Sequence, residues 1–213
     1  MEEAIMFKNA YNQLKKDGMV EKEVSKRVAT GWMDAEYKVI KYKGLEFEAK
    51  QDESSCEFIL GNMEIDRDVL IVNYHRDFYI SRNDIITEEE VKELYRGERD
   101  WEATEKAKGY WMFELSCLIH GGVWLNFGGE GFACDSDGWD TSRVGLVLVS
   151  KKIARTKKQA EKLGRQLVYN YNKLLEGDVY YVKVLKDGKE IDSCGGLLGE
   201  FGVYQFVKEY TKK

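Results

Sequence analysis

Residues 109–150 have the sequence GYWMFELSCLIHGGVWLNFGGEGFACDSDGWDTSRVGLVLVS, which differs from ordinary globular sequence. Three apolar runs surround a loop rich in glycine and carboxylates, and this loop ends in Asp135-Ser136-Asp137-Gly138-Trp139-Asp140-Thr141-Ser142. We expect the rest of the chain to be arranged around this stretch. A hairpin turn is expected at His120-Gly121-Gly122, and an apolar strand is expected after Gly145, leading to Ser150-Lys151.

The whole chain of 213 residues is 43% hydrophobic and 33% charged. This composition and length predict a folded protein with one core, or with a core and a small additional unit. No run approaches the ~18 apolar residues of a membrane span, and acids stand near the N-terminus where a signal peptide has bases. We expect a cytoplasmic protein with no membrane partner. The four cysteines contain no C-x-x-C pair, so we expect them to be reduced and to hold no structural zinc.

The N-terminal half predicts helices followed by strands. Apolar residues at helical spacing indicate a helix over residues 2–16, closed by Asp17-Gly18, and a second helix from Glu21 with Val24, Val28 and Trp32 on one face. Alternation on both sides of Lys43-Gly44 predicts a hairpin. Further strands are expected at residues 56–60, 69–74 and 78–81.

The remaining elements have clear local signals. Thr87 and Glu90 form the pattern of a capping box, which predicts a helix to about Arg96. A long helix is expected over residues 156–176, with one apolar face formed by Ala160, Leu163, Leu167, Tyr171 and Leu174. A hairpin is expected at Asp187-Gly188, between strands 179–185 and 190–194, and then a closing helix over residues 201–210.

These elements predict an α+β fold, in which an antiparallel sheet with hairpins packs against the long helix of the C-terminal half. We expect a helical and hairpin module over residues 1–108 and an α+β core domain over residues 109–213. The absence of proline removes the commonest linker chemistry, which favours a continuous body.

Two segments have opposite charge. Nine acids and three bases lie between residues 84 and 105, whereas seven bases and one acid lie between residues 151 and 165. Either segment is explained by a solvated helix face. The basic segment would also suit a phosphate backbone, and the acidic segment would suit a basic groove that normally holds nucleic acid.

The loop at Asp135, Trp139, Asp140 and Ser142 is predicted to be structural. Its short polar side chains can accept hydrogen bonds from the backbone, and we expect Trp139 to be buried at the edge of the core. Its replacement by Ala would then cost about 3–5 kcal/mol. The alternative is a metal site at Asp135, Asp137 and Asp140, since alternating carboxylates suit a hard cation, but the order of residues does not fit an EF-hand.

Other candidate motifs are incomplete. Cys117 and His120 would make a Cys/His dyad or part of a zinc site only if the fold brought Cys134 or Asp192 beside them, so a turn histidine exposed to water is favoured. Gly128-Gly129-Glu130-Gly131 is not followed by the Gly-Lys-Ser/Thr of a phosphate loop, which favours a flexible connection. We therefore expect no enzyme activity, no cofactor and no bound metal.

The motif D-S-D-G-W-D-T-S-R-V-G at residues 135–145 resembles a family of small accessory proteins of bacteriophages and mobile elements of Gram-positive bacteria. The resemblance continues through residues 171–180 and 190–194 and covers about residues 110–199, with Asp137 and Gly195 departing from the family pattern. It implies a mobile-element origin, in which small acidic proteins commonly act on host defence. It implies no particular reaction.

The sequence therefore predicts a phage protein that binds and inhibits a host defence nucleoprotein, such as a Cas effector, in the manner of anti-CRISPR proteins. The partner-binding residues expected are the acidic side chains of Glu88, Glu89, Glu93 and Glu102, which would occupy a channel lined by Lys and Arg. Two alternatives remain. One is a metal-dependent hydrolase using Asp135, Asp137, Asp140 and Asp192, and the other is a nucleic-acid-binding accessory protein using the basic segment.

Overall fold

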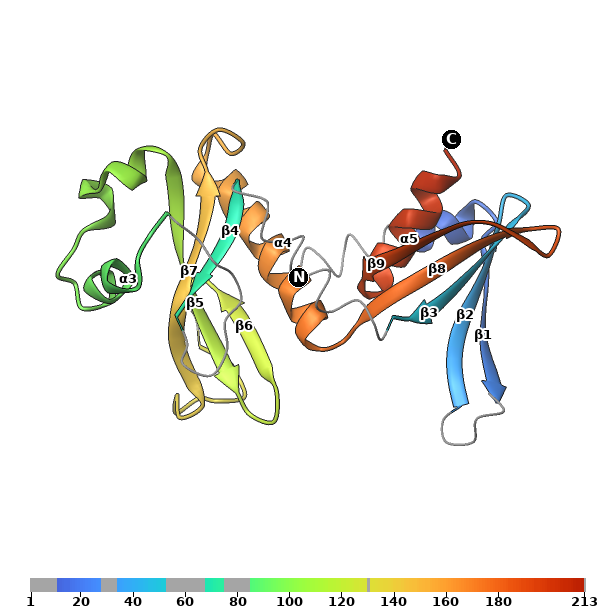
Figure 1. Ribbon diagram of the computed structural model, residues 1–213, viewed down its shortest axis with the longest axis horizontal. Coiled ribbons are helices and arrows are strands. Elements are labelled where there is room, and N and C mark those ends of the chain that lie inside the picture. Colours follow the sequence, from blue (N-terminus) through green and yellow to red (C-terminus); the bar gives the residue numbers. More distant parts are fainter. Residues whose placement is uncertain (1–10, 28–33, 53–67, 75–84, 130, 213) are drawn as a thin grey trace. The chain divides into compact units, whose positions relative to one another are not determined.

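The computed structural model describes residues 11–27, 34–52, 68–74, 85–129 and 131–212. Two compact units are present, and each contains one antiparallel sheet (Figure 1). The first unit combines Met1–Glu57 with Gly177–Lys213, and the second unit is Phe58–Glu176. The predicted α+β class with hairpins and a long helix is confirmed.

The expected division at residues 108/109 differs from the one in the structure. The strand at residues 45–51 pairs with the strand at residues 179–186, so both ends of the chain build one sheet. Likewise, the strand at residues 69–73 pairs with the strand at residues 141–150. These long-range pairings place the N-terminal hairpin with the C-terminal one, and the central part of the chain forms a unit of its own.

The first unit has a five-stranded sheet in the order β1-β2-β3-β8-β9. Its strands are β1 (Val20–Arg27), β2 (Asp34–Tyr42), β3 (Leu45–Gln51), β8 (Val179–Lys186) and β9 (Lys189–Leu198). Helix α5 (Gly199–Tyr210) and the helical residues 11–16 supply apolar side chains to the same core as the sheet. Phe47, which is fully buried, lies in this core with Val184 and Val207.

Both predicted hairpins of the first unit are confirmed. Lys43 and Gly44 have φ values of 49° and 77°, and Asp187 and Gly188 have 52° and 75°. Positive φ at both central residues is what a two-residue type I′ turn requires, and it matches the twist of the flanking strands. The predicted closing helix is also confirmed as α5.

The predicted second helix from Glu21 is wrong, because residues 20–27 form strand β1. Val20 pairs with Lys41 and Val24 pairs with Tyr37, so backbone pairing with β2 overrides the helical spacing of the valines. The charged composition of β1 suits its position at the edge of the sheet. Val28 and Trp32 lie outside the described residues. The first predicted helix is confirmed over residues 11–16, and residues 1–10 are not described.

The second unit has a four-stranded sheet in the order β4-β7-β5-β6. Its strands are β4 (Val69–Asn73), β5 (Tyr110–Ile119), β6 (Val123–Phe127) and β7 (Thr141–Ser150). Helix α4 (Lys157–Leu175) packs with one set of sheet residues, including Val147, and the segment of α3 (Glu88–Tyr95) packs with another set, including Leu146. Because β7 is central and packed on both faces, seven consecutive residues of it are buried. The expected strands at 56–60 and 78–81 lie outside the described residues.

Helix α4 confirms the predicted long helix, and Ala160, Tyr171 and Leu174 of the predicted apolar face are buried, but the middle of the buried face differs from the prediction. Gly164 and Val168 are buried, whereas Leu163 is 36% exposed and Leu167 is partly buried. The cause is the close approach of the helix at Gly164, where an added Cβ would lie 2.4 Å from the Phe127 ring. Among the described helices, none combines the length and the apolar composition that a membrane crossing requires.

Candidate functional site

A polar pocket opens in the first unit, where the sequence predicted no functional site. It has a volume of about 490 Å³ and is lined by Tyr11, Lys15, Glu21, Glu23, Lys38, Glu200 and Tyr204. Lys38 forms ion pairs with Glu200, Glu21 and Glu23, and the Tyr204 hydroxyl donates to Glu21 at 2.6 Å. Burial, together with this bond to Glu21, raises the pKa of Tyr204. The carboxylates of the pocket are therefore already paired within the fold.

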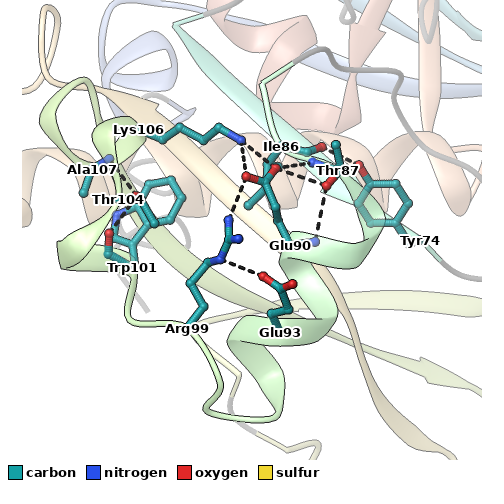
Figure 2. Close-up of polar contacts among 10 residues, drawn as sticks. All are labelled: Tyr74, Ile86, Thr87, Glu90, Glu93, Arg99, Trp101, Thr104, Lys106 and Ala107. Carbon is teal, nitrogen blue, oxygen red and sulfur yellow. Dashed lines mark hydrogen bonds and ion pairs between the residues drawn. The ribbon is translucent and has the colours of Figure 1, made fainter.

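In the second unit, the acidic segment forms α3, the 3-10 turns Trp101–Ala103 and Glu105–Lys108, and the connections between them. Figure 2 shows Glu90 at the centre of its polar contacts. Arg99 donates to Glu90 at 2.8 Å and Lys106 at 2.6 Å, and the Thr87 backbone N–H donates at 2.8 Å. Thr87 also accepts from the Glu90 backbone, so the predicted capping box is confirmed.

The Glu90 carboxylate is strongly stabilised in its charged form. Partial burial opposes ionisation, but the hydrogen bonds from Lys106 and Thr87 outweigh it and lower the pKa of Glu90 from 4.5 to about 2. Glu90 therefore holds the helix start, Arg99 and Lys106 together. Its role in the described structure is to join parts of the segment rather than to present charge to a partner.

Replacing Glu90 by Gln is expected to lower the melting temperature at neutral pH, because the partners of the carboxylate lose its charge. Since the folded pKa is below the unfolded one, this stabilisation is complete above about pH 4.5 and is lost as the pH falls toward about 2. The difference in melting temperature between the wild type and Glu90→Gln should close over that range. Glu105→Gln, which removes an 85% exposed carboxylate, is the control with little effect. A difference independent of pH would contradict this role.

The four glutamates expected to bind a partner have different surroundings. Glu88 is exposed and pairs with Lys92 at 2.8 Å, and Glu89 is exposed and lies 3.6 Å from Arg96. Glu93 is half-buried and pairs with Arg99 at 2.7 Å. Glu102 is exposed and has no ion pair within the described part of the chain. The segment thus neutralises much of its own charge, and over residues 85–108 eight acids accompany five bases.

The basic segment is arranged differently. Five exposed cations form no ion pair with any described residue, and we call them the basic surface: Lys152, Arg155, Lys157, Lys158 and Lys162. The other two bases of the segment are engaged in the fold, since Lys151 lies 4.6 Å from the Trp111 ring and Arg165 lies 4.9 Å from the Phe127 ring. The basic surface therefore offers its charge to solvent.

The position of the basic surface adds to its positive potential. Lys157 and Lys158 occupy the first turn of α4, which contains no acid and is capped by Thr156. A helix N-terminus carries a partial positive charge, so acids are favoured there and cations are not. The cations at this helix N-terminus repel one another and the helix dipole, which slightly destabilises the free protein. An anionic ligand would relieve this repulsion.

The carboxylate-rich loop before β7 is held by Asp135. Its carboxylate accepts from the backbone N–H of Trp139 and of Asp140, both at 3.0 Å, and from the Thr141 hydroxyl at 2.6 Å. The bond from Thr141, with those from the backbone, lowers the pKa of Asp135. The predicted structural role is supported for Asp135. The Ser142 hydroxyl lies 3.5 Å from the sulfur of Cys117 and joins the start of β7 to β5.

The expectation that Trp139 is buried is wrong, because this side chain is 88% exposed. The bonds that order the loop are made by the Trp139 backbone and by its neighbours, so the indole is not needed to fix the conformation. The predicted loss of about 3–5 kcal/mol for Trp139→Ala, which assumed burial, therefore does not apply. Asp140 is 44% exposed and lies 2.8 Å from His120, which is exposed in the hairpin turn as predicted.

The metal and nucleophile hypotheses gain no geometric support. Within the described ranges, no cluster of three His, Cys, Asp or Glu side chains is suited to a metal ion. Both oxygens of Asp135 accept hydrogen bonds from the loop. Cys117 is buried beside Ser142, and burial raises the pKa of its thiol, which is the opposite of what a reactive cysteine needs.

No family model, no curated protein and no solved structure matches the chain.

Proposed function

We propose that the protein is a phage or mobile-element protein that binds a nucleoprotein complex of host defence and inhibits it, as anti-CRISPR proteins do. The observation that carries the proposal is the basic surface, whose five cations are exposed and have no ion-pair partner in the described structure. Such a surface fits the phosphate backbone of the nucleic acid in the complex, because bound phosphates release counterions and relieve the repulsion among the cations. The mobile-element origin is supported by the resemblance at residues 135–145.

The acidic segment supplies a second, weaker contact for basic protein side chains that normally hold nucleic acid. Glu89 and Glu102 are suited to it because reversing them breaks no short ion pair. Glu88 and Glu93 belong to the same set, but their reversal would also disrupt pairs with Lys92 and Arg99. The basic surface is therefore the principal contact in this proposal, and the acidic segment adds orientation and on-rate.

A nucleic-acid-binding accessory protein is the second candidate, and the same basic surface favours it. In that case the protein would bind nucleic acid alone, with no effect on a defence complex. The two candidates differ in whether the chain protects an infecting phage.

The proposal is tested by expressing the chain in bacteria that carry an active CRISPR system and measuring how efficiently a targeted phage forms plaques. The test variant has Lys152, Lys157, Lys158 and Lys162 replaced by Glu. Its fold should be retained, because all four positions are exposed and acids at positions 157 and 158, in the first turn of α4, complement the helix dipole. We expect wild-type protein to restore plaques, and the variant to lower this effect by about tenfold or more.

The matched control replaces Lys16, Lys22, Lys186 and Lys189 by Glu, which changes the net charge equally at exposed positions of the first unit. This control should protect the phage as well as the wild type does. Equal protection by the basic-surface variant would overturn the assigned contact. If the wild type protects against none of the CRISPR types tested but still binds a DNA duplex, the accessory protein is the correct assignment.

A further inference from the structure

Trp139 is the most exposed of the large hydrophobic side chains that the structure describes. Its 88% exposure compares with 52% for Ile191 and 51% for Val20. Tryptophan is among the residues most enriched in the energetically dominant part of protein interfaces, where a large rigid side chain fills a pocket of the partner. Because the loop does not use the indole for its own stability, this exposure points to a contact with another molecule.

The loop is ordered before any partner arrives. The Asp135 carboxylate holds the backbone at Trp139 and at Asp140, and Gly138, with φ of +71°, provides the turn that precedes the indole. A loop already held in one conformation loses less entropy on binding. Trp139 is thus presented by a rigid support, which is the arrangement expected of a binding anchor.

The charges beside Trp139 limit what the partner can be. Asp137 and Asp140 flank it in sequence, and both are exposed. Anionic side chains next to the indole disfavour a phosphate backbone and an anionic lipid surface. They favour Lys and Arg side chains, which also interact with the face of an indole. We therefore expect the partner to be a protein whose surface has an apolar pocket surrounded by basic side chains.

The loop and the basic surface are separate contacts within the second unit. The loop precedes β7 and the basic surface follows it, and a strand of ten residues spans about 30 Å (Figure 1). We propose that Trp139 anchors the protein to a partner protein, by entering an apolar pocket rimmed by lysine or arginine. The inference goes beyond the proposed function and does not depend on the basic surface.

The test places a photo-crosslinking amino acid at position 139 of the full chain, in bacteria that are infected by a phage. A control places it at Ile191, an exposed hydrophobic position of the first unit. We expect position 139 to crosslink to protein, at a site whose neighbours are apolar side chains together with Lys or Arg. A crosslink to nucleic acid, to lipid or to a second copy of this chain would overturn the inference, as would a yield no higher than that of the control.

The partner identified by crosslinking is then purified, and its affinity for variants at position 139 is measured. Trp139→Ala should weaken binding by about tenfold or more, and Trp139→Phe should weaken it less, because Phe keeps an aromatic ring for the pocket. Trp139→Ala should leave the melting temperature and the affinity for a DNA duplex unchanged. If Trp139→Ala binds the partner as the wild type does, the inference fails while the proposed function stands. If the partner carries no nucleic acid, the proposed function fails while the inference stands.

Discussion

Replacing Gly145 by Ala is expected to lower the free energy of unfolding of the second unit by about 3 kcal/mol or more. Gly145 lies in β7 opposite Asn73 of β4, and an added Cβ would lie 1.9 Å from the backbone oxygen of Val72. The obstacle is backbone within the sheet, so no side-chain rotation relieves it. The Gly145 carbonyl also accepts from the Tyr95 hydroxyl, so a shift of the strand would disturb that bond as well.

Chemical denaturation of Gly145→Ala measures this loss directly. Gly131→Ala is a matched control, because it adds the same methyl group in the same unit at a position with no atom within 4 Å and no positive φ. The control should stay within about 0.5 kcal/mol of the wild type. A similar small effect for Gly145→Ala would show that β4 and β7 do not approach as closely as described.

Replacing Phe47 by Ala is expected to destabilise the first unit by about 3–5 kcal/mol, as for other buried aromatic residues. Phe47 lies in β3 and is fully buried, and its ring makes edge contacts with Phe206 at 6.3 Å and Tyr210 at 5.9 Å. These partners belong to α5, more than 150 residues later in the chain. The residue therefore joins the two ends of the chain in one core.

Hydrogen exchange of the two variants tests the division into units. Phe47→Ala should reduce protection mainly in β3, β8 and α5, and Gly145→Ala should reduce it mainly in β4, β5 and β7. Each variant is the control for the other, since both are destabilising substitutions and each lies in a different unit. If Phe47→Ala lowered protection throughout residues 1–108 and left β8 and α5 unchanged, the division at residues 108/109 expected from the sequence would be the better description.

The elements that the sequence predicted correctly depend on local interactions. Lys43-Gly44 and Asp187-Gly188 are tight turns in which Gly44 and Gly188 adopt positive φ without steric cost, and Thr87 caps α3 through a residue three positions later. Such signals lie within a few residues of one another. Strand β1 was missed because its valines repeat every four residues, and only pairing with β2 decides its conformation.

The division into units and the exposure of Trp139 could not be predicted for a related reason. Pairing between β3 and β8 joins residues more than 100 positions apart, and no local pattern specifies it. Tryptophan side chains are largely buried on average, so the sequence favoured burial of Trp139, and its exposure is visible only in the folded loop, which the Asp135 bonds hold without the indole.

The sequence shows where charged residues cluster, but it does not show which of these charges are neutralised by ion pairs in the folded protein. The pair of Glu88 and Lys92 has helical spacing, whereas the bonds of Lys106 to Glu90 depend on the turns between them. These pairs reduce the charge of the acidic segment. The basic segment contains a single acid, Glu161, and its five exposed cations form no ion pair with any described residue, which explains why their charge remains available.

The salt dependence of binding to a short DNA duplex tests the basic surface most directly. Each phosphate that the protein neutralises makes the affinity fall more steeply with salt, so five exposed cations predict a slope of about −3 to −5 in log K against log salt between about 50 and 200 mM. Replacing Lys152, Lys157, Lys158 and Lys162 by Glu should abolish this binding, and the matched first-unit variant should keep the wild-type slope. A wild-type affinity that does not change with salt, or that survives in the basic-surface variant, would contradict the account.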